Sequence, residues 1–324
     1  MNAPTTTAIE ARPSGRAQSF RQRLRAGDDL TYLVTLIAAS SIVAITGLLV
    51  YELYINSAAS RHQFGWAFLT TSTWDPVAGQ FGALPFIYGT VVTSALALFI
   101  GIPLGVGAAI FLAELAPPKI SSGLTFLIEL LAAVPSVIFG VLGIFILIPI
   151  LRTFEEPIRK TLGWTPLFQG PFYGVSMLAA GVVLAVMIIP FIISISREVI
   201  LAVPNDQREA ALALGATRWE STWDVVIPFA YKGITGSIFL ALARSLGETM
   251  AVTMVIGNDP KIHASLFAPG YSIAAVIANE FTEATGDLYT SALIELGLVL
   301  FALTIVINGA ARILVASTSQ KGGS

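Results

Sequence analysis

The sequence predicts an all-α membrane protein with six transmembrane helices. Its 324 residues are 55% hydrophobic and only 12% charged, whereas soluble domains carry about 25% charged residues. Six separate apolar runs also approach or exceed the roughly 20 residues that a helix needs to cross a bilayer core of about 30 Å. The net charge of −2 gives no reason to expect nucleic-acid binding. Cysteine is absent, which excludes disulfides and thiolate chemistry, and two histidines are too few for a histidine-based metal site.

The apolar runs place the six predicted spans at about 30–51, 86–113, 123–150, 172–197, 233–257 and 288–312. The second begins only after the breaker-rich stretch "AGQFGALP". Residues 30–316 therefore form one membrane domain between a polar tail at 1–29 and a short tail at 317–324. The small residues in "INSAAS" would also suit a cleaved signal peptide. The first run is longer than a signal-peptide core and begins late, so we interpret it as a permanent helix.

The distribution of basic residues predicts the orientation. Six spans put both termini on one side, and cytoplasmic loops carry an excess of Lys and Arg. With a cytoplasmic N-terminus, eleven basic residues lie inside: Arg12, Arg16, Arg21, Arg23, Arg25, Lys119, Arg208, Arg218, Lys232, Arg312 and Lys321. Five lie outside: Arg61, Arg152, Arg159, Lys160 and Lys261. Both termini are therefore expected in the cytoplasm.

Charged residues within the spans are candidate functional residues. On a continuous helix Arg244 would lie about 12 residues, or roughly 18 Å, beyond Lys232, with Glu248 one turn further on the same face. Either charge costs about 2.5–3.5 kcal/mol at the bilayer centre. The pair therefore suits a neutral structural contact, a proton relay or a substrate site. Arg197 either faces the pathway or reaches the inner interface. Glu129, near the predicted cytoplasmic edge, and Glu295 are weaker candidates.

The loop between the fourth and fifth spans, residues 203–231, carries the most specific motif. Pro204 begins a segment of strong helix formers, "QREAALAL", and Gly215 is expected to end that helix. The order of residues resembles the signature of binding-protein-dependent ABC importer permeases: E-A-A, three residues, G, nine residues, then I-x-L-P. The matching positions are Glu209, Ala210, Ala211, Gly215, Val225, Ile227 and Pro228. The resemblance implies a type I importer (MetI-like) fold, with this loop helix docking on a separate ATPase subunit.

Further segments resemble the phosphate-specific permeases of the Pst system, and "LGETMAV" and "AAVIANEF" fit the PstC type better than the PstA type. The resemblance implies a subunit of the bacterial inner membrane that imports inorganic phosphate. Its implied partners are a PstA-type permease, a PstB-type ATPase dimer and a periplasmic or lipid-anchored phosphate-binding protein. This chain is expected to bind no cofactor. It contains no G-x-x-x-x-G-K-[ST] motif, so ATP and Mg²⁺ belong to the partner ATPase.

Phosphate would explain an arginine inside the membrane, because a guanidinium donates paired hydrogen bonds to phosphate oxygens and stays charged. We therefore expect Arg244 to contact phosphate, Glu248 to orient it, and Arg197 to act nearer the exit. One alternative is another oxyanion such as phosphonate or molybdate. A second is a proton-coupled secondary transporter, which the coupling motif disfavours. A third, a membrane-embedded enzyme, lacks a candidate nucleophile paired with a base.

Overall fold

The structure, a computed structural model, describes residues 28–319. The predicted tail at 1–29 lies outside the described residues, except for Asp28 and Asp29, which begin the first helix. The predicted tail at 317–324 also lies largely outside them. Besides helices, the described residues form only two isolated β-bridges. Six of the helices are long and apolar enough to cross a membrane.

The helices follow one another in this order: α2 (Asp28–Asn56), α3 (Ala58–Phe64), α4 (Ala67–Thr70), α5 (Leu84–Ile110), the π-helical turn η1 (Phe111–Leu115), α6 (Pro118–Ala132), α7 (Ser136–Leu142), the π-helical turn η2 (Gly143–Leu147), α8 (Ile148–Leu162), the 3₁₀ turn η3 (Pro166–Phe168), α9 (Met177–Leu201), α10 (Asn205–Ala213), α11 (Arg218–Ser221), the π-helical turn η4 (Thr222–Val226), α12 (Ile227–Leu246), α13 (Met250–Val255), α14 (Ile273–Glu280) and α15 (Asp287–Ser319).

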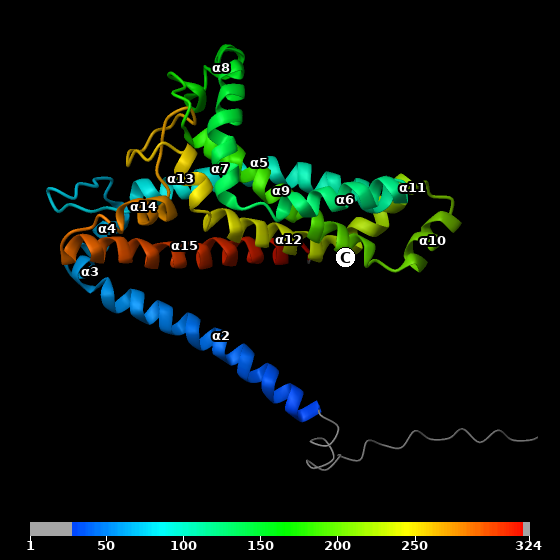
Figure 1. Cartoon of the computed structure of the whole chain (residues 1–324). Coiled ribbons are helices and arrows are strands. Elements are labelled where there is room, and N and C mark those ends of the chain that lie inside the picture. The colour runs from blue at the N-terminus through cyan, green and yellow to red at the C-terminus, as the bar shows by residue number, and fades with distance from the viewer. Residues whose placement is uncertain (1–27, 320–324) are drawn as a thin grey trace, which may run out of the picture. The chain divides into compact units, whose positions relative to one another are not determined.

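The chain divides into two units, residues 1–52 and 53–324. The described part of the first is the helix α2, whose last turn continues into the second. In the second unit, α5, α6, α9, α12 and α15 lie side by side as a bundle (Figure 1). The short helices α10 and α11 lie at one end of this bundle, and α3, α4 and α14 lie at the other. The helix α8 points away from the bundle axis (Figure 1).

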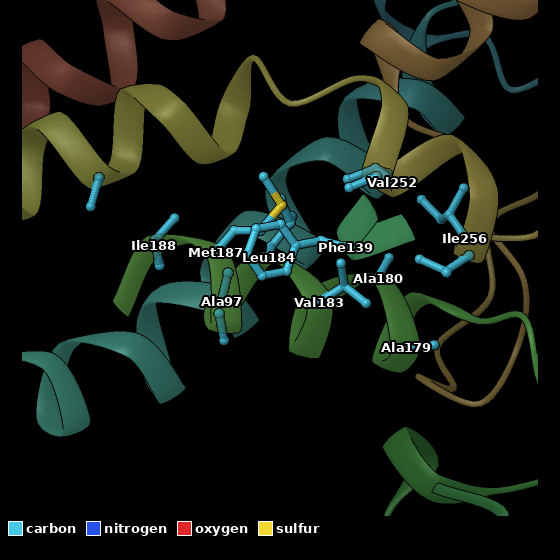
Figure 2. Packing of buried hydrophobic residues seen from close by; sticks show 14 of the residues in the cluster. Ala97, Phe139, Ala179, Ala180, Val183, Leu184, Met187, Ile188, Val252 and Ile256 are labelled. Carbon is cyan, nitrogen blue, oxygen red and sulfur yellow. The ribbon is translucent and has the colours of Figure 1, made fainter. Parts of the chain in front are cut away.

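The helix α9 forms the centre of the bundle. It packs along α5 and also contacts α6, α7, α12 and α13. Figure 2 shows its side chains Val183, Leu184 and Met187 gathered with Ala97 of α5 and Val252 of α13 in one buried apolar cluster. Lipid is as apolar as these side chains, so packing rather than the hydrophobic effect is expected to hold membrane helices together. The cluster therefore fixes the relative positions of α5, α9 and α13.

The third predicted span, 123–150, is interrupted in the structure. Helix α6 ends at Ala132, and Pro135 precedes the new helix α7. Proline has no N–H to donate and disfavours helical geometry in the residue before it, which accounts for the break. The segment also begins earlier than predicted, at Pro118. Glu129 lies in α6, which is not among the helices long and apolar enough to cross a membrane; the third such helical stretch is 136–162.

The fifth predicted span, 233–257, also differs in the structure. Its main helix, α12, begins at Ile227 and ends at Leu246, and the short helix α13 follows only from Met250. Gly247 is the C-cap residue of α12. Other spans also extend beyond their predicted ends: α2 continues to Asn56, α9 to Leu201 and α15 to Ser319. The break in the fifth span matters most, because the two candidate charges lie on either side of it.

Gly89 supports a close approach between α5 and the loop before α14. A Cβ atom at this position would lie 2.2 Å from the carbonyl oxygen of Tyr271, which is backbone and cannot turn aside. We expect Gly89→Ala to destabilise the protein by roughly 1–3 kcal/mol, the usual cost of overpacking. Thermal unfolding of the purified protein in detergent should show a lowered midpoint. Gly123→Ala, where nothing lies within 4 Å, is the matched control; an equal midpoint for both variants would contradict this packing.

Candidate functional site

Arg244 lies at the end of a helix in the middle of the fifth span. Arg244 occupies the last turn of α12 and is exposed on the surface of the bundle. Among the described residues it has no hydrogen bond and no ion pair. The C-terminal end of a helix carries a partial negative charge that favours a cation there. The helix end thus stabilises the guanidinium and leaves its five N–H donors free for another molecule.

Glu248 lies in the break itself and is partly buried. Its Oε1 accepts a hydrogen bond of 3.4 Å from the backbone N–H of Ala251, in the first turn of α13. The N-terminal end of a helix carries a partial positive charge, which favours a carboxylate. Each of the two charges is therefore placed beside the helix end that stabilises it.

The predicted pairing of Arg244 with Glu248 on one helical face is wrong for this structure. The prediction assumed a continuous helix, but α12 ends at Leu246, before Glu248. No ion pair within 4.0 Å joins the two side chains. Unwound backbone at membrane depth is tolerated where it is buried in protein or lines a water-filled cavity, and broken helices of this kind form substrate sites in transporters.

Arg197 lies one turn before the end of α9. Its side chain is 17% exposed and its Nη1 donates to Oε1 of Glu198 at 2.8 Å. Its Nε is buried and has no hydrogen-bond partner among the described residues. This arginine is therefore only partly satisfied within the chain.

A hydrogen bond between two serines relates the positions of Arg197 and Arg244 along the two neighbouring helices α9 and α12. The hydroxyls of Ser196 on α9 and Ser237 on α12 lie 2.8 Å apart and are buried. Arg197 directly follows the first serine, and Arg244 lies seven residues beyond the second, or about 10 Å along α12. The two arginines thus occupy neighbouring helices at different depths.

The weaker candidates lie apart from this region. Glu295 on α15 is 6% exposed, and its Oε2 has no hydrogen-bond partner within the part of the chain that the structure describes. The side chain lines a cavity of about 630 Å³ with Arg61 and Trp66, toward the end of the bundle opposite α10. Glu129 is exposed on α6. Within the described residues, no group of three or more His, Asp or Glu side chains could hold a metal ion.

The loop helix α10 spans Asn205–Ala213 and ends in a left-handed glycine. Gly215 has φ +88°, its N–H donates to the carbonyl of Leu212, and the N–H of Ala216 donates to that of Ala211. These two bonds define a Schellman motif, the end that the sequence predicts. Glu209 and Ala210 are exposed, whereas Ala211 is buried against the bundle. Of the remaining motif residues, Val225 lies in η4, and Ile227 and Pro228 begin α12.

Arg208, which precedes the E-A-A motif, is a residue that the sequence reasoning missed. Its Nη2 donates to Oε1 of Glu114 at 2.8 Å and its Nε donates to the same oxygen at 3.1 Å. The two side chains are only 18% and 12% exposed. Because the partners are 94 residues apart, no local pattern in the sequence indicates the pair.

Gly215 gives a testable property of the loop. An alanine at φ +88° would occupy the left-handed region, at a cost of roughly 1–2 kcal/mol. Gly215→Ala is therefore expected to speed amide hydrogen exchange in α10 by about tenfold, because 1.4 kcal/mol corresponds to that factor. Gly236→Ala is the control, since no left-handed φ is found there and nothing lies within 4 Å. Unchanged exchange in the Gly215 variant would contradict the motif.

Comparisons with known proteins agree with this arrangement. The chain is 45% identical to the phosphate transport system permease protein PstC of Mesorhizobium japonicum, over 98% of each chain. It is 41% identical to the PstC protein of Xylella fastidiosa, over 99% of this chain and all of the relative. A crystal structure of a bacterial alginate ABC transporter contains a chain that superposes with a TM-score of 0.60 at 16% identity, over 92% of this chain and 98% of that one.

Six apolar helices, a span broken between two charges and a loop helix exposed at one end of the bundle define a multi-pass inner-membrane permease subunit. The family model described as "binding-protein-dependent transport system inner membrane component" matches residues 101–320. The chain belongs to that family. The predicted all-α, type I importer fold is therefore confirmed.

Proposed function

We propose that this chain is the PstC-type membrane subunit of an ATP-driven importer of inorganic phosphate. The observation that carries the proposal is Arg244, an exposed guanidinium without a partner among the described residues, inside a membrane span. It occurs in a chain similar over nearly its whole length to proteins named as phosphate permeases. A guanidinium matches phosphate because it offers paired, charge-assisted hydrogen bonds to the anion's oxygens.

In this proposal the translocation pathway forms where the Arg244 side of α12 meets a second, PstA-type permease. Arg244 contacts the phosphate ion while the ion loses its hydration water. Arg197 contacts the ion later, nearer the inner exit. Glu248 lies in the unwound segment and limits how tightly the anion binds, although it does not pair with Arg244 in this structure. Transient rather than tight binding is needed, because an ion must leave a pathway as well as enter it.

The chain itself supplies no ATPase site in this proposal and acts as a transport subunit rather than an enzyme. A PstB-type ATPase dimer holds ATP and Mg²⁺ and docks on α10, and a phosphate-binding protein delivers the anion from the other side. Both termini lie in the cytoplasm. The end of α15 supports this orientation, because it lies at the same end of the bundle as α10 and α11 (Figure 1).

Reconstitution of the four components in proteoliposomes tests the proposal. ATP-dependent accumulation of radiolabelled phosphate is expected, with little competition from molybdate or a phosphonate. Preferential uptake of either competitor would assign a different oxyanion. Uptake driven by a proton gradient without ATP would identify a secondary transporter and exclude the proposed importer.

A further inference from the structure

The Arg208–Glu114 ion pair connects the loop helix to the membrane helices. We propose that this ion pair is the mechanical connection through which α10 moves the inner end of α5, so that it sets the amount of phosphate imported for each ATP hydrolysed. The inference rests on the proposed function, because it takes α10 as the surface on which the ATPase docks. It adds a positioning residue, Arg208, that does not touch phosphate.

Apolar packing attaches α10 only weakly to the bundle. Ala211 is its one buried residue among those described, whereas Leu212 is 44% exposed and Leu214, just beyond its end, is 91% exposed. The main neighbours of α10 are α11 and η4, which follow it in the chain. Leu212, Thr222 and Arg208 line a cavity of about 330 Å³ between α10 and its neighbours. A force applied to α10 therefore reaches α5 through polar contacts rather than through a packed core.

The guanidinium of Arg208 makes those polar contacts to two membrane helices at once. Its Nε and Nη2 hold the carboxylate of Glu114 on η1, the turn that continues α5. Its Nη2 also donates to the carbonyl of Ile200 at 2.8 Å, and its Nη1 donates to that of Val203. The carbonyl of Ile200 belongs to the C-terminal end of α9, which favours a cation, and Val203 lies two residues beyond that helix. One side chain thus joins α10 to α5 and α9.

The pair is suited to transmitting movement. A guanidinium and a carboxylate that share more than one hydrogen bond have a fixed relative orientation, which a lysine would not impose. Both groups are mostly buried, so salt screens them little. If α10 moved without Glu114, it would leave a partly buried carboxylate unpaired, which is costly. The inner end of α5 is therefore expected to follow α10.

This connection complements the covalent one. The chain itself joins α10 to α12 through α11 and η4, and joins α10 to α9 through the three residues 202–204. The Arg208–Glu114 pair adds α5, which lies much further away along the chain. Displacement of the loop helix would thereby move α5 together with α9 and α12, the two helices that hold a candidate phosphate contact. Without the pair, ATP hydrolysis would still displace α9 and α12 but would move α5 less.

The test measures ATP hydrolysis and radiolabelled phosphate uptake in the same proteoliposomes with the complete complex. Arg208→Gln and Glu114→Gln are each expected to lower the phosphate imported per ATP by at least about fivefold, the lower limit of typical coupling between sites. The phosphate imported per ATP by Arg208→Lys should lie between the values of these variants and that of the wild type. The control is Arg159→Gln, which breaks the exposed Arg159–Glu156 pair on α8. A merely structural role would lower the amount of complex or reduce both activities together; an unchanged ratio overturns the inference.

A cross-link supplies a second measurement that does not depend on charge. Because the chain contains no cysteine, Glu114→Cys and Arg208→Cys can be combined in a complex whose other subunits also lack cysteine. The double variant should show the lowered ratio, and joining the two thiols with a short bifunctional reagent should restore it. A cross-linked complex that hydrolyses ATP but stays uncoupled overturns the inference. A wild-type complex without ATP-dependent phosphate uptake would instead refute the proposed function.

Discussion

Replacing Arg244 by glutamine is expected to lower phosphate uptake by about 100-fold while the complex still assembles. The guanidinium is exposed and has no partner among the described residues, so its removal breaks no contact that holds the chain together. Phosphate would lose two charge-assisted hydrogen bonds, each contributing about 1.5 kcal/mol or more. Since 1.4 kcal/mol is a factor of ten, the combined loss corresponds to roughly two orders of magnitude.

The measurement is initial phosphate uptake in proteoliposomes, together with the yield and thermal midpoint of the purified complex. Arg244→Lys should retain more activity than the glutamine variant, because it keeps the charge but not the planar pair of donors. Arg152→Gln, an arginine on α8 bonded only to the carbonyl of Tyr173 among the described residues, controls for loss of positive charge. Uptake by Arg244→Gln at the wild-type rate would remove this residue from the pathway.

Glu248 should behave differently from Arg244. A carboxylate paired with the arginine would give a variant as inactive as Arg244→Gln. In the structure the only side-chain hydrogen bond of Glu248 among the described residues is the 3.4 Å contact to Ala251, at the start of α13. The two residues are therefore expected to be separable in function, which a shared helical face would not allow.

The sequence was sufficient to predict the membrane spans because each apolar run has a physical requirement of length and composition. Every predicted span overlaps a helix of the structure. The loop helix could also be predicted, since its start and its left-handed glycine are local signals. Features determined by neighbouring residues were therefore predicted well.

The helix breaks could not be predicted in the same way. Pro135 precedes a new helix, yet Pro103 and Pro190 lie inside α5 and α9, which continue past them. Proline alone therefore does not decide where a membrane helix ends. Whether a break is tolerated depends on what satisfies the freed backbone groups, and that partner belongs to another part of the chain or to water. The same holds for Gly247, whose break separates Arg244 from Glu248.

The Arg208–Glu114 pair shows the same limit for side chains. Each residue taken alone has the sequence pattern of an ordinary charge near the cytoplasmic end of a span. Only the fold brings η1 and α10 together and reveals that both are mostly buried. Within the candidate site, the residue types were predictable and their partners were not.

Replacing Glu209 by lysine is expected to weaken ATPase binding by roughly 30-fold. Glu209 is exposed on α10 and has no hydrogen bond or ion pair among the described residues. A carboxylate on a docking helix with no partner in its own chain is expected to meet a cation on the ATPase. Reversing its charge would place two like charges together, and such contacts at interfaces cost several kcal/mol. Even about 2 kcal/mol corresponds to the stated loss.

Binding of the purified ATPase to the permease pair in detergent, titrated at two salt concentrations, measures this effect. Ala211 provides the structural contrast, because it is buried against the bundle and a larger side chain there should destabilise the permease rather than the interface. Glu156→Lys on α8, which points away from the bundle axis (Figure 1), makes the same charge change away from the docking surface. If Glu209→Lys and Glu156→Lys bind the ATPase equally well, the exposed face of α10 does not contact the ATPase through Glu209.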